Sequence, residues 1–228
     1  MIRLFIESDL KATEFLELSV FQTHYLAHVM RLKEDDEIIC FNGRQGEWTA
    51  RLSYVKRKAF LTVQKQLRRQ KNLPECILCP ALIKKEAMDF IWQKATELGA
   101  TQIYPIIAER SVVKSFNQKH VLSVIHEACE QCERMDVPQV QEPETLERVL
   151  QQLQGKAYLI WLSERGEEAC GEFDKTPAFF VGPEGGWSLK EQKLLKEKAN
   201  SEWHFGQTIL RSETACLSAL AIYQAKKK

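Results

Sequence analysis

The stretch "PAFFVGPEGGWSLKEQ", residues 177–192, combines three patterns that decide the fold. Its first five residues are all apolar, which is typical of a strand buried on both faces. The glycines of "GPEGG" permit backbone conformations that other residues avoid, and the proline stiffens the turn. Ser188 is followed three residues later by Glu191, which is the capping-box pattern of a helix start. The stretch therefore predicts a strand, a tight turn and a helix, as in an α/β domain.

The same alternation of strands and helices runs through the chain from Pro74 onward. The stretch 156–162 is almost wholly apolar, whereas 84–99 carries an apolar stripe at helical spacing. We predict an α/β domain with a mainly parallel sheet over residues 74–228. The expected strands are 76–83, 101–108, 156–162, 177–182 and 202–206, and the expected helices are 84–99, 117–135, 143–153, 188–199 and 212–228.

The first seventy residues follow a different pattern, with short strands separated by turns. Asn42 and Gly43 give a strong turn signal between apolar strands. Rough alternation in 47–55 and 58–67 is typical of half-buried antiparallel strands. We therefore predict a small β-barrel domain over residues 1–70. The other expected elements are a strand at 2–6 and a brief helix at 24–32.

Charge is unevenly distributed along a chain of 228 residues whose formal net charge is only +1. Residues 1–73 hold 13 Lys and Arg against 9 Asp and Glu, and the remainder holds 19 against 22. The stretch from Arg44 to Lys71 contains nine basic residues and one acidic residue, Glu47. Such a stripe suits a polyanionic partner. The alternative for any one of these residues is a solvated strand surface with Lys guarding an edge.

Compartment and metal content are predicted from what the sequence contains and lacks. No export signal and no apolar run of about 18 residues is found, so we expect a cytoplasmic protein without a membrane span. Seven cysteines, an odd number without framework-like spacing, favour free thiols. Two CxxC pairs, Cys76–Cys79 and Cys129–Cys132, could in principle bind zinc, but the first pair lies much further from the second in sequence than in a usual zinc ribbon. The histidines are scattered along the chain. We predict no metal site.

The end of another predicted strand, at residues 202–206, is followed by polar and charged residues that could bind a ligand together with the glycine turn. Familiar nucleotide fingerprints are absent, both the P-loop and GxGxxG, so another loop-built pocket is needed. The stretch "WHFGQTILRSETA", residues 203–215, runs from a short strand into the start of the last helix. Ser212 and Glu213 there are also ordinary helix-capping residues. Arg211 could hold a carboxylate, a phosphate or a developing anion. From the residues alone, a structural turn and a ligand loop at 182–186 are equally supported.

The two segments together resemble the paired signature of the SPOUT methyltransferases. Within that superfamily they are most similar to the RsmE-type family, which methylates N3 of a uridine in small-subunit ribosomal RNA. The resemblance covers residues 74–228, and the front of the chain resembles the family's PUA-like RNA-binding module. The chain departs from the family at Phe205, where leucine is common, and near Thr208, where a basic residue is common. The stretches that carry the resemblance are "GPEGGWS", "FGQTILRSETA", "KATELGATQIYPI", "ERSV", "EACEQCERMDVPQV", "IRLFI" and "HVMRL".

The resemblance implies a deep trefoil knot in the second domain, S-adenosylmethionine as cofactor and a homodimer that completes the site. Its implied substrate is 16S ribosomal RNA within the small subunit. Arg211 and Glu213 are the implied catalytic residues, and Arg3, Arg31, Lys56, Arg57 and Lys58 are the expected RNA contacts. Three loops are expected to bind the cofactor, through Leu162, Glu164, Gly182, Gly185, Gly186, Ile209, Leu210, Ser212, Thr214 and Ala215.

Two other functions remain open from the sequence. One is a SPOUT methyltransferase that acts on another RNA position, such as a ribose hydroxyl of transfer RNA. The other is a non-catalytic RNA-binding protein that keeps the fold for ribosome assembly. The sequence does not specify the target nucleotide, the group that removes the N3 proton, or which subunit of a dimer supplies each residue.

Overall fold

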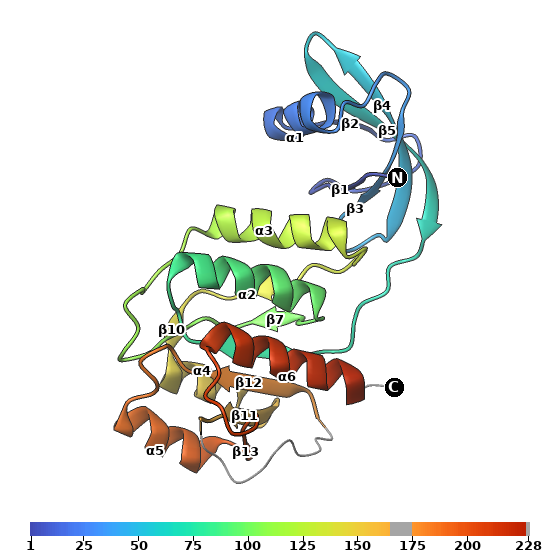
Figure 1. Cartoon of the computed structure of the whole chain (residues 1–228). Coiled ribbons are helices and arrows are strands. Elements are labelled where there is room, and N and C mark those ends of the chain that lie inside the picture. Colours follow the sequence, from blue (N-terminus) through green and yellow to red (C-terminus); the bar gives the residue numbers. More distant parts are fainter. Residues whose placement is uncertain (165–174, 227–228) are drawn as a thin grey trace. The chain divides into compact units, whose positions relative to one another are not determined.

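The computed structural model describes residues 1–164 and 175–226 (Figure 1). The chain forms two compact units. The first consists of residues 1–72 together with 129–137, and the second contains the rest. The short segment 129–137 was expected in the second domain on sequence grounds, but it groups with the first unit.

The first unit is built on a five-stranded sheet in the order β1-β3-β4-β5-β2. β1 pairs with β3 in parallel, and the other neighbours are antiparallel. Alternate residues of these strands are buried in one apolar core, as the predicted half-buried strands require. Gly43 adopts a φ of +77°, which confirms the turn predicted at Asn42-Gly43. The strands are β1 (Arg3–Phe5), β2 (Phe15–Glu17), β3 (Glu37–Phe41), β4 (Glu47–Val55) and β5 (Lys58–Arg68).

The helix of the first unit begins earlier than the sequence suggested. α1 spans Val20–His24 and continues as a π-helical turn, η1, over Tyr25–Val29. Its start is set by a capping box in which Ser19 and Gln22 bond each other's backbone N–H groups. This signal precedes the range 24–32 that apolar spacing predicted, so the first turn was missed.

The second unit is built on a six-stranded parallel sheet in the order β13-β11-β12-β6-β7-β9. The prediction of a mainly parallel α/β sheet is therefore confirmed. Two further short strands, β8 and β10, pair in parallel beside it. The strands are β6 (Ile77–Pro80), β7 (Gln102–Ile103), β8 (Ile106–Ile107), β9 (Gln139–Val140), β10 (Glu144–Thr145), β11 (Tyr158–Leu162), β12 (Pro177–Val181) and β13 (Ser201–Trp203).

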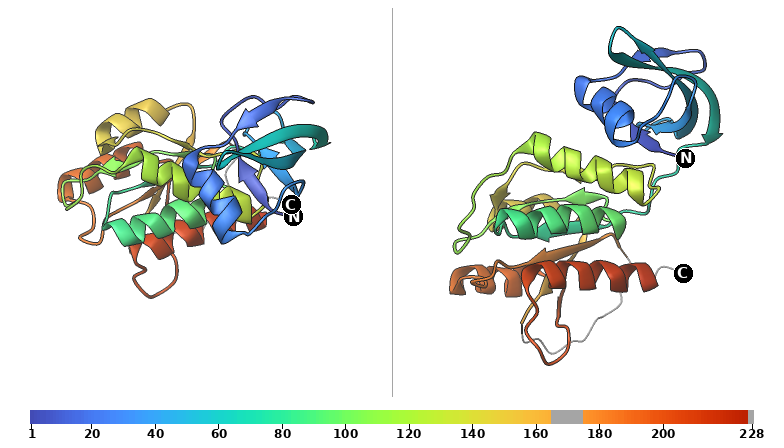
Figure 2. Two further views of the ribbon diagram at one scale, coloured as in Figure 1. Left: turned by 90° about the horizontal axis from the view of Figure 1, so that it is seen from above. Right: turned by 45° about the horizontal axis from the view of Figure 1, so that its top comes forward.

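Helices cover both faces of this sheet. α2 and α6 run side by side over β6 and β12 (Figures 1 and 2). On β12, Phe180 joins the apolar cluster of α4 and α5, whereas Phe179 packs against Trp203 and against Tyr223 of α6. The strand is thus buried on both faces, as its apolar sequence predicted. The helices are α2 (Lys85–Glu97), α3 (Gln118–Gln131), α4 (Leu146–Leu153), α5 (Leu189–Lys198) and α6 (Ser212–Lys226). The last two residues of the predicted final helix, 227–228, lie outside the described residues.

Residues 1–164 and 175–226 contain six of the seven cysteines. The six cysteines in these ranges are reduced thiols, and all but Cys132 are buried. No three His, Cys, Asp or Glu side chains within them come together in a way that could hold a metal ion. None of the helices in these ranges has both the length and the apolar content needed to cross a bilayer.

A partly buried imidazole is expected to make the stability of the second unit depend on pH. Burial lowers the pKa of His126, on α3, from 6.5 to about 4. Between these values the unfolded chain binds a proton that the folded chain does not, so the free energy of unfolding should fall as pH drops from 6.5 to 4. Above pH 6.5 both states are neutral, and no contribution remains. Urea unfolding of wild type and His126→Gln across this range should give a shallower pH dependence for the variant. Equal slopes would contradict the assignment.

Candidate active site

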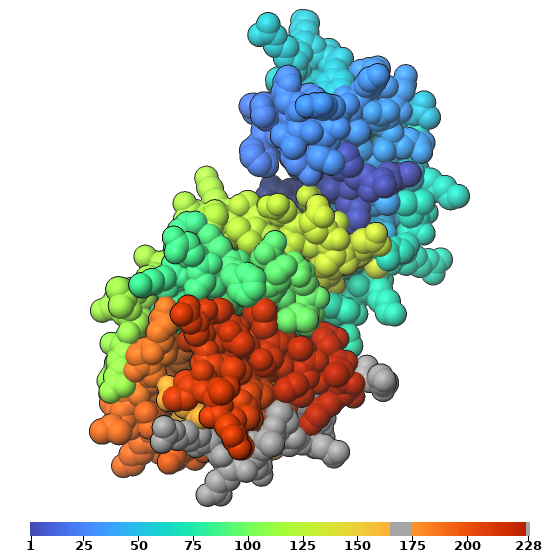
Figure 3. Space-filling view, viewed as in Figure 1, coloured from blue at the N-terminus to red at the C-terminus, as the bar shows by residue number. Residues whose placement is uncertain are grey.

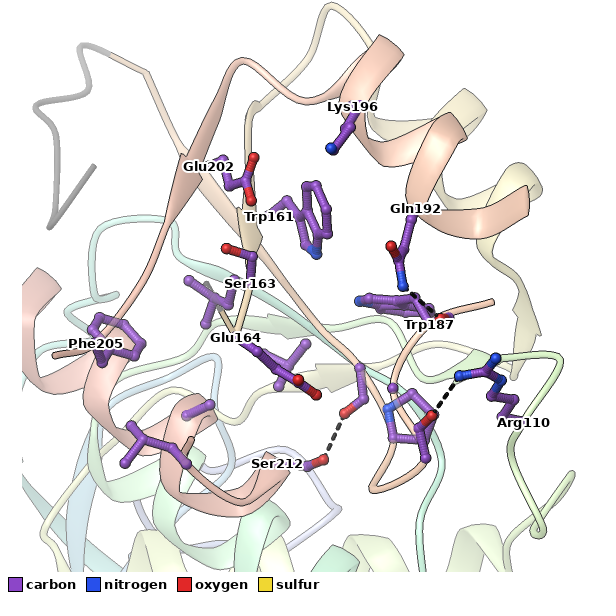
Figure 4. Close-up of a pocket in the computed structure, with 18 of the residues that line it drawn as sticks. Arg110, Trp161, Ser163, Glu164, Trp187, Gln192, Lys196, Glu202, Phe205 and Ser212 are labelled. Carbon is purple, nitrogen blue, oxygen red and sulfur yellow. Dashed lines mark hydrogen bonds between the residues drawn. The ribbon is translucent and has the colours of Figure 1, made fainter. Parts of the chain in front are cut away.

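The candidate site lies where three neighbouring parallel strands end. The carboxyl ends of β11, β12 and β13 lie at the same edge of the sheet, and ligands of open α/β sheets gather at such edges. A cavity of about 410 Å³ opens there (Figure 4). Gly185, from the glycine turn, and Leu210, from the segment before α6, both line it. The two segments singled out from the sequence therefore share one cavity.

The glycine turn is held rigidly by bonds to its backbone. Gly182 O accepts a 2.6 Å hydrogen bond from Ser212 Oγ, and Gly185 O accepts one of 2.9 Å from Arg110 (Figure 4). A side chain at Gly182 would place its Cβ only 3.0 Å from Nε1 of Trp187. Gly186 adopts a φ of +67°, a conformation that favours glycine. The turn is thus a structural element and a cavity wall at once.

The helix after the turn begins at the predicted capping box. Ser188 Oγ accepts from the backbone N–H of Glu191, and the Glu191 carboxylate accepts from the backbone N–H of Ser188. The same buried carboxylate also accepts a 2.9 Å bond from the N–H of Glu109. That second role could not be read from local spacing, because the two residues lie 82 positions apart. It fixes the segment that carries Arg110 beside the glycine turn.

Most of the predicted cofactor-binding residues line the cavity. Two do not: Ile209, which is 57% exposed, and Thr214, which is exposed on α6. The loop that follows β11, the glycine turn and the start of α6 each contribute to the wall. The predicted residues found there are Leu162, Glu164, Gly182, Gly185, Gly186, Leu210, Ser212 and Ala215.

The predicted catalytic residues flank the cavity without lining it. Ser212 lines the wall, and its neighbours Arg211 and Glu213 are exposed and half-buried respectively. Within the part of the chain that the structure describes, neither makes an ion pair. The segment that leads into α6 lies at the surface of the second unit (Figure 3). The Arg211 guanidinium is therefore accessible to a molecule that approaches the cavity from outside.

The nearby thiol of Cys216 is unsuited to nucleophilic chemistry. Burial, reinforced by the nearby Glu213 carboxylate, raises the pKa of Cys216 well above its usual range. A thiol must lose its proton to act as a strong nucleophile. Cys216 is therefore a core residue of α6.

Sequence reasoning missed several polar residues of the cavity wall. Trp161 and Ser163, from the end of β11, and Trp187, beside the turn, each bury a polar atom that has no hydrogen-bond partner among the described residues. Lys196 and Glu202 line the same wall from α5 and β13. For two of the cavity residues the sequence held a weak signal. Gln192 and Lys196 are four residues apart, so they share one face of the predicted helix and could be expected to line the same surface. The other residues come from separate elements.

The expected RNA contacts differ in their surroundings. Arg3 is 7% exposed and ion-paired with Glu47, so its position does not support the phosphate contact expected from the sequence. Arg31, Lys56 and Arg57 are exposed, and the residues that the structure describes provide none of the three with an ion-pair partner. The basic stripe is partly neutralised elsewhere. Its paired members are Arg44 with Asp9, Arg51 with Asp35 and Glu37, Lys58 with Glu17, and Arg68 with Glu47.

Comparisons with known proteins agree with this geometry. Residues 69–224 match the model of an RNA methyltransferase domain, and residues 22–64 match that of an RNA methyltransferase PUA domain. The ribosomal RNA small subunit methyltransferase E of Bacillus subtilis is 30% identical, over 97% of this chain and 95% of its own. The protein of the same name from a Synechocystis species is 32% identical, over 94% of this chain and 74% of its own. The crystal structure of the Neisseria gonorrhoeae namesake, bound to S-adenosyl methionine, superposes with a TM-score of 0.89 at 27% identity and covers 99% of this chain and 98% of that one.

Proposed function

The chain belongs to the RNA methyltransferase family, and from that premise we propose that it transfers a methyl group from S-adenosylmethionine to N3 of a uridine in 16S ribosomal RNA of the small subunit. The observation that carries the proposal is the cavity at the ends of β11, β12 and β13, which joins both signature segments. Similarity over almost the whole chain to proteins named for this activity supports it.

The cavity residues fit S-adenosylmethionine. A volume of about 410 Å³ falls in the range of about 300–1,000 Å³ that is usual for small-molecule sites. The indole N–H groups of Trp161 and Trp187 are buried donors without partners among the described residues, and a bound molecule with acceptor atoms would satisfy them. The bare backbone of Gly186 allows close approach. When bound, S-adenosylmethionine supplies a methyl group that its sulfonium already activates.

The chain's own residues position the reactants and handle charge. N3 of uridine carries a proton and attacks well only after that proton leaves, so negative charge spreads to the neighbouring carbonyl oxygens. In this proposal Arg211, which is exposed next to the cavity residue Ser212, stabilises that charge. Glu213, two residues further on, is assigned in the same proposal to orient Arg211 when the RNA is bound or to relay the proton. The walls of the cavity hold the reactants together and exclude water.

The fold details implied by the family belong to the same proposal. We propose that the segment before α6 is threaded into a trefoil knot. Ser212, at the end of that segment, bonds to the turn after β12, which supports the idea. We further propose that the first unit closes into a barrel of the PUA type, and that a second copy of the chain completes the site beside Arg211. The cytoplasm, where small subunits are assembled, is the proposed location.

The first unit is proposed to bind ribosomal RNA through exposed cations. Arg31, Lys56 and Arg57 are exposed, and Lys58 continues the same turn although Glu17 partly neutralises it. Cations of this kind neutralise phosphates and fix the orientation of the RNA. The target base would be turned out of its stack to reach the cavity.

The turn between β4 and β5 provides a test of this RNA contact. Lys56 and Arg57 form a two-residue hairpin with φ of +48° and +69°, a conformation that favours Asn-Gly and costs other residues about 1 kcal/mol each. We expect the double variant Lys56→Asn/Arg57→Gly to raise the free energy of unfolding by about 1 kcal/mol. We also expect it to weaken RNA binding about tenfold and to lower the salt slope by about 2.

Filter binding at several salt concentrations and urea unfolding measure the two effects. Lys33→Asn is the matched control, because Lys33 is exposed in the same unit but is followed directly by four acidic residues. If the double variant binds RNA as tightly as wild type, the turn is not an RNA contact.

Methylation of purified small subunits that lack the modification tests the function itself. Labelled S-adenosylmethionine should transfer its methyl group, and mass spectrometry of the digested RNA should identify 3-methyluridine. A methylated ribose would instead favour a SPOUT enzyme with another target. RNA binding without cofactor binding or transfer would favour the non-catalytic assembly protein.

A further inference from the structure

Two phenylalanine rings are stacked on the solvent-facing side of the sheet in the first unit. The rings of Phe15, on β2, and Phe60, on β5, have centroids 4.9 Å apart and planes inclined by 9°. Phe15 is 57% exposed although Phe60 covers one face of its ring, so the opposite face is open to solvent. Adjoining exposed apolar groups, unlike single ones, often mark a binding surface. The ring pair is therefore a candidate site.

The strand register explains why these rings point outward. Side chains alternate between the two faces of a strand, and Leu16 and Leu61, the sequence neighbours of the two rings, are buried in the core of the first unit. Phe15 lies opposite Thr62 of β5. The Thr62 side chain is partly exposed on the outer face, and its hydroxyl has no hydrogen-bond partner among the residues that the structure describes. The outer face thus offers an open ring with a free hydroxyl beside it.

Cations without partners lie close to the ring pair. Lys56 and Arg57 form the turn between β4 and β5, and Arg57 precedes Phe60 by three residues, about 10 Å along an extended strand. Neither cation is ion-paired within residues 1–164 and 175–226. The acid on the same face, Glu17, is neutralised by Lys58. The charge around the rings therefore favours an anionic partner.

An unpaired nucleotide of RNA combines the features that match this surface. Bases of single-stranded RNA stack on aromatic side chains, their edges bond to polar side chains, and their phosphates bind cations. We propose that an unpaired RNA base stacks on the open face of Phe15, with Thr62 at its edge and the phosphate backbone at Lys56 and Arg57. This assignment rests on the proposed binding of RNA by the first unit.

The stacking site adds discrimination that the cations alone do not provide. Lys56 and Arg57 attract the phosphates of a single strand and of a duplex alike. Bases inside a duplex are stacked on one another and present no free face to Phe15. The first unit should therefore prefer a loop or an unpaired strand.

Removal of the aromatic face with little loss of apolar area tests the stack. Phe15→Leu should weaken binding of a single-stranded oligouridylate about tenfold, since one base–aromatic stack is lost. Its salt slope should equal that of wild type, because no cation is removed, whereas Lys56→Asn/Arg57→Gly lowers the slope. Phe15→Tyr should bind as wild type does, since it keeps the ring. Affinity for an RNA duplex of the same length should change less than about twofold in Phe15→Leu.

Filter binding at several salt concentrations measures these affinities, and urea unfolding verifies that each variant is folded. Phe21→Leu is the matched control, because Phe21, on α1, is 79% exposed and stacks on no other ring in the described part of the chain. It should bind both RNAs as wild type does.

Three results overturn the stacking site. They are unchanged oligouridylate affinity in Phe15→Leu, an equal loss for strand and duplex, and a loss of the same size in Phe15→Tyr or Phe21→Leu. Self-association of wild type that Phe15→Leu abolishes, with RNA affinity unchanged, would show that a second copy of the chain covers the rings instead. In each case binding through Lys56 and Arg57 still stands. A wild-type protein that binds neither RNA overturns the proposed RNA contact of the first unit as well, so the two failures are distinguishable.

Discussion

Replacement of Arg211 by alanine is expected to reduce methyl transfer to small subunits by about 10²–10³-fold, the usual cost of removing one donor that stabilises a developing anion. Cofactor affinity should change less than twofold, because the Arg211 side chain does not line the cavity. Single-turnover methylation with labelled cofactor measures the first effect, and titration with S-adenosylhomocysteine measures the second. Arg211→Lys should recover only part of the activity, since an ammonium keeps the charge without the planar fork.

Gln207→Ala is the matched control for that experiment. Gln207 is exposed in the same segment before α6 and does not line the cavity. The variant should methylate at the wild-type rate. If Arg211→Ala also turns over at the wild-type rate, Arg211 has no catalytic role, and stabilisation of the charged base must come from another group.

Local patterns were sufficient to predict the alternating strands and helices of the second unit and the two loops that meet at its cavity. The apolar run that became β12 is buried on both faces, and the Ser188–Glu191 capping box forms as expected. These features depend on residues that are close in sequence. Because parallel strands share an edge, two loops that follow such strands could be expected to meet, and Gly182 and Ser212 do bond.

Features that depend on distant residues could not be predicted. The Glu191 carboxylate accepts a bond from the Glu109 N–H, and the cavity wall joins side chains of β11, α5 and β13. Periodicity records which face of an element is apolar, but it does not record which polar groups meet at its end. The same limit explains Arg3, which looked like a surface cation because its partner Glu47 lies 44 residues away.

The ion pairs of Glu47 provide the second large expected effect. Glu47 is 2% exposed and bonds both Arg3, which is also buried, and Arg68. Arg3 in turn donates a 3.1 Å bond to the backbone carbonyl of Arg134, in the distant segment 129–137 of the same unit. Burial lowers the pKa of Arg3, with Arg68 contributing, so its charge needs the carboxylate nearby.

Glu47→Ala should therefore lower the free energy of opening of the first unit by about 3–5 kcal/mol, since it leaves a buried guanidinium unpaired. Hydrogen exchange at the amides of β3, β4 and β5 measures this opening. Glu37→Ala is the matched control, because Glu37 pairs with Arg51 at the surface and should cost less than about 1 kcal/mol. The double variant Arg3→Met/Glu47→Leu should recover most of the loss, because neither charge remains buried. A loss as small as that of Glu37→Ala would show that water, and not Glu47, satisfies Arg3.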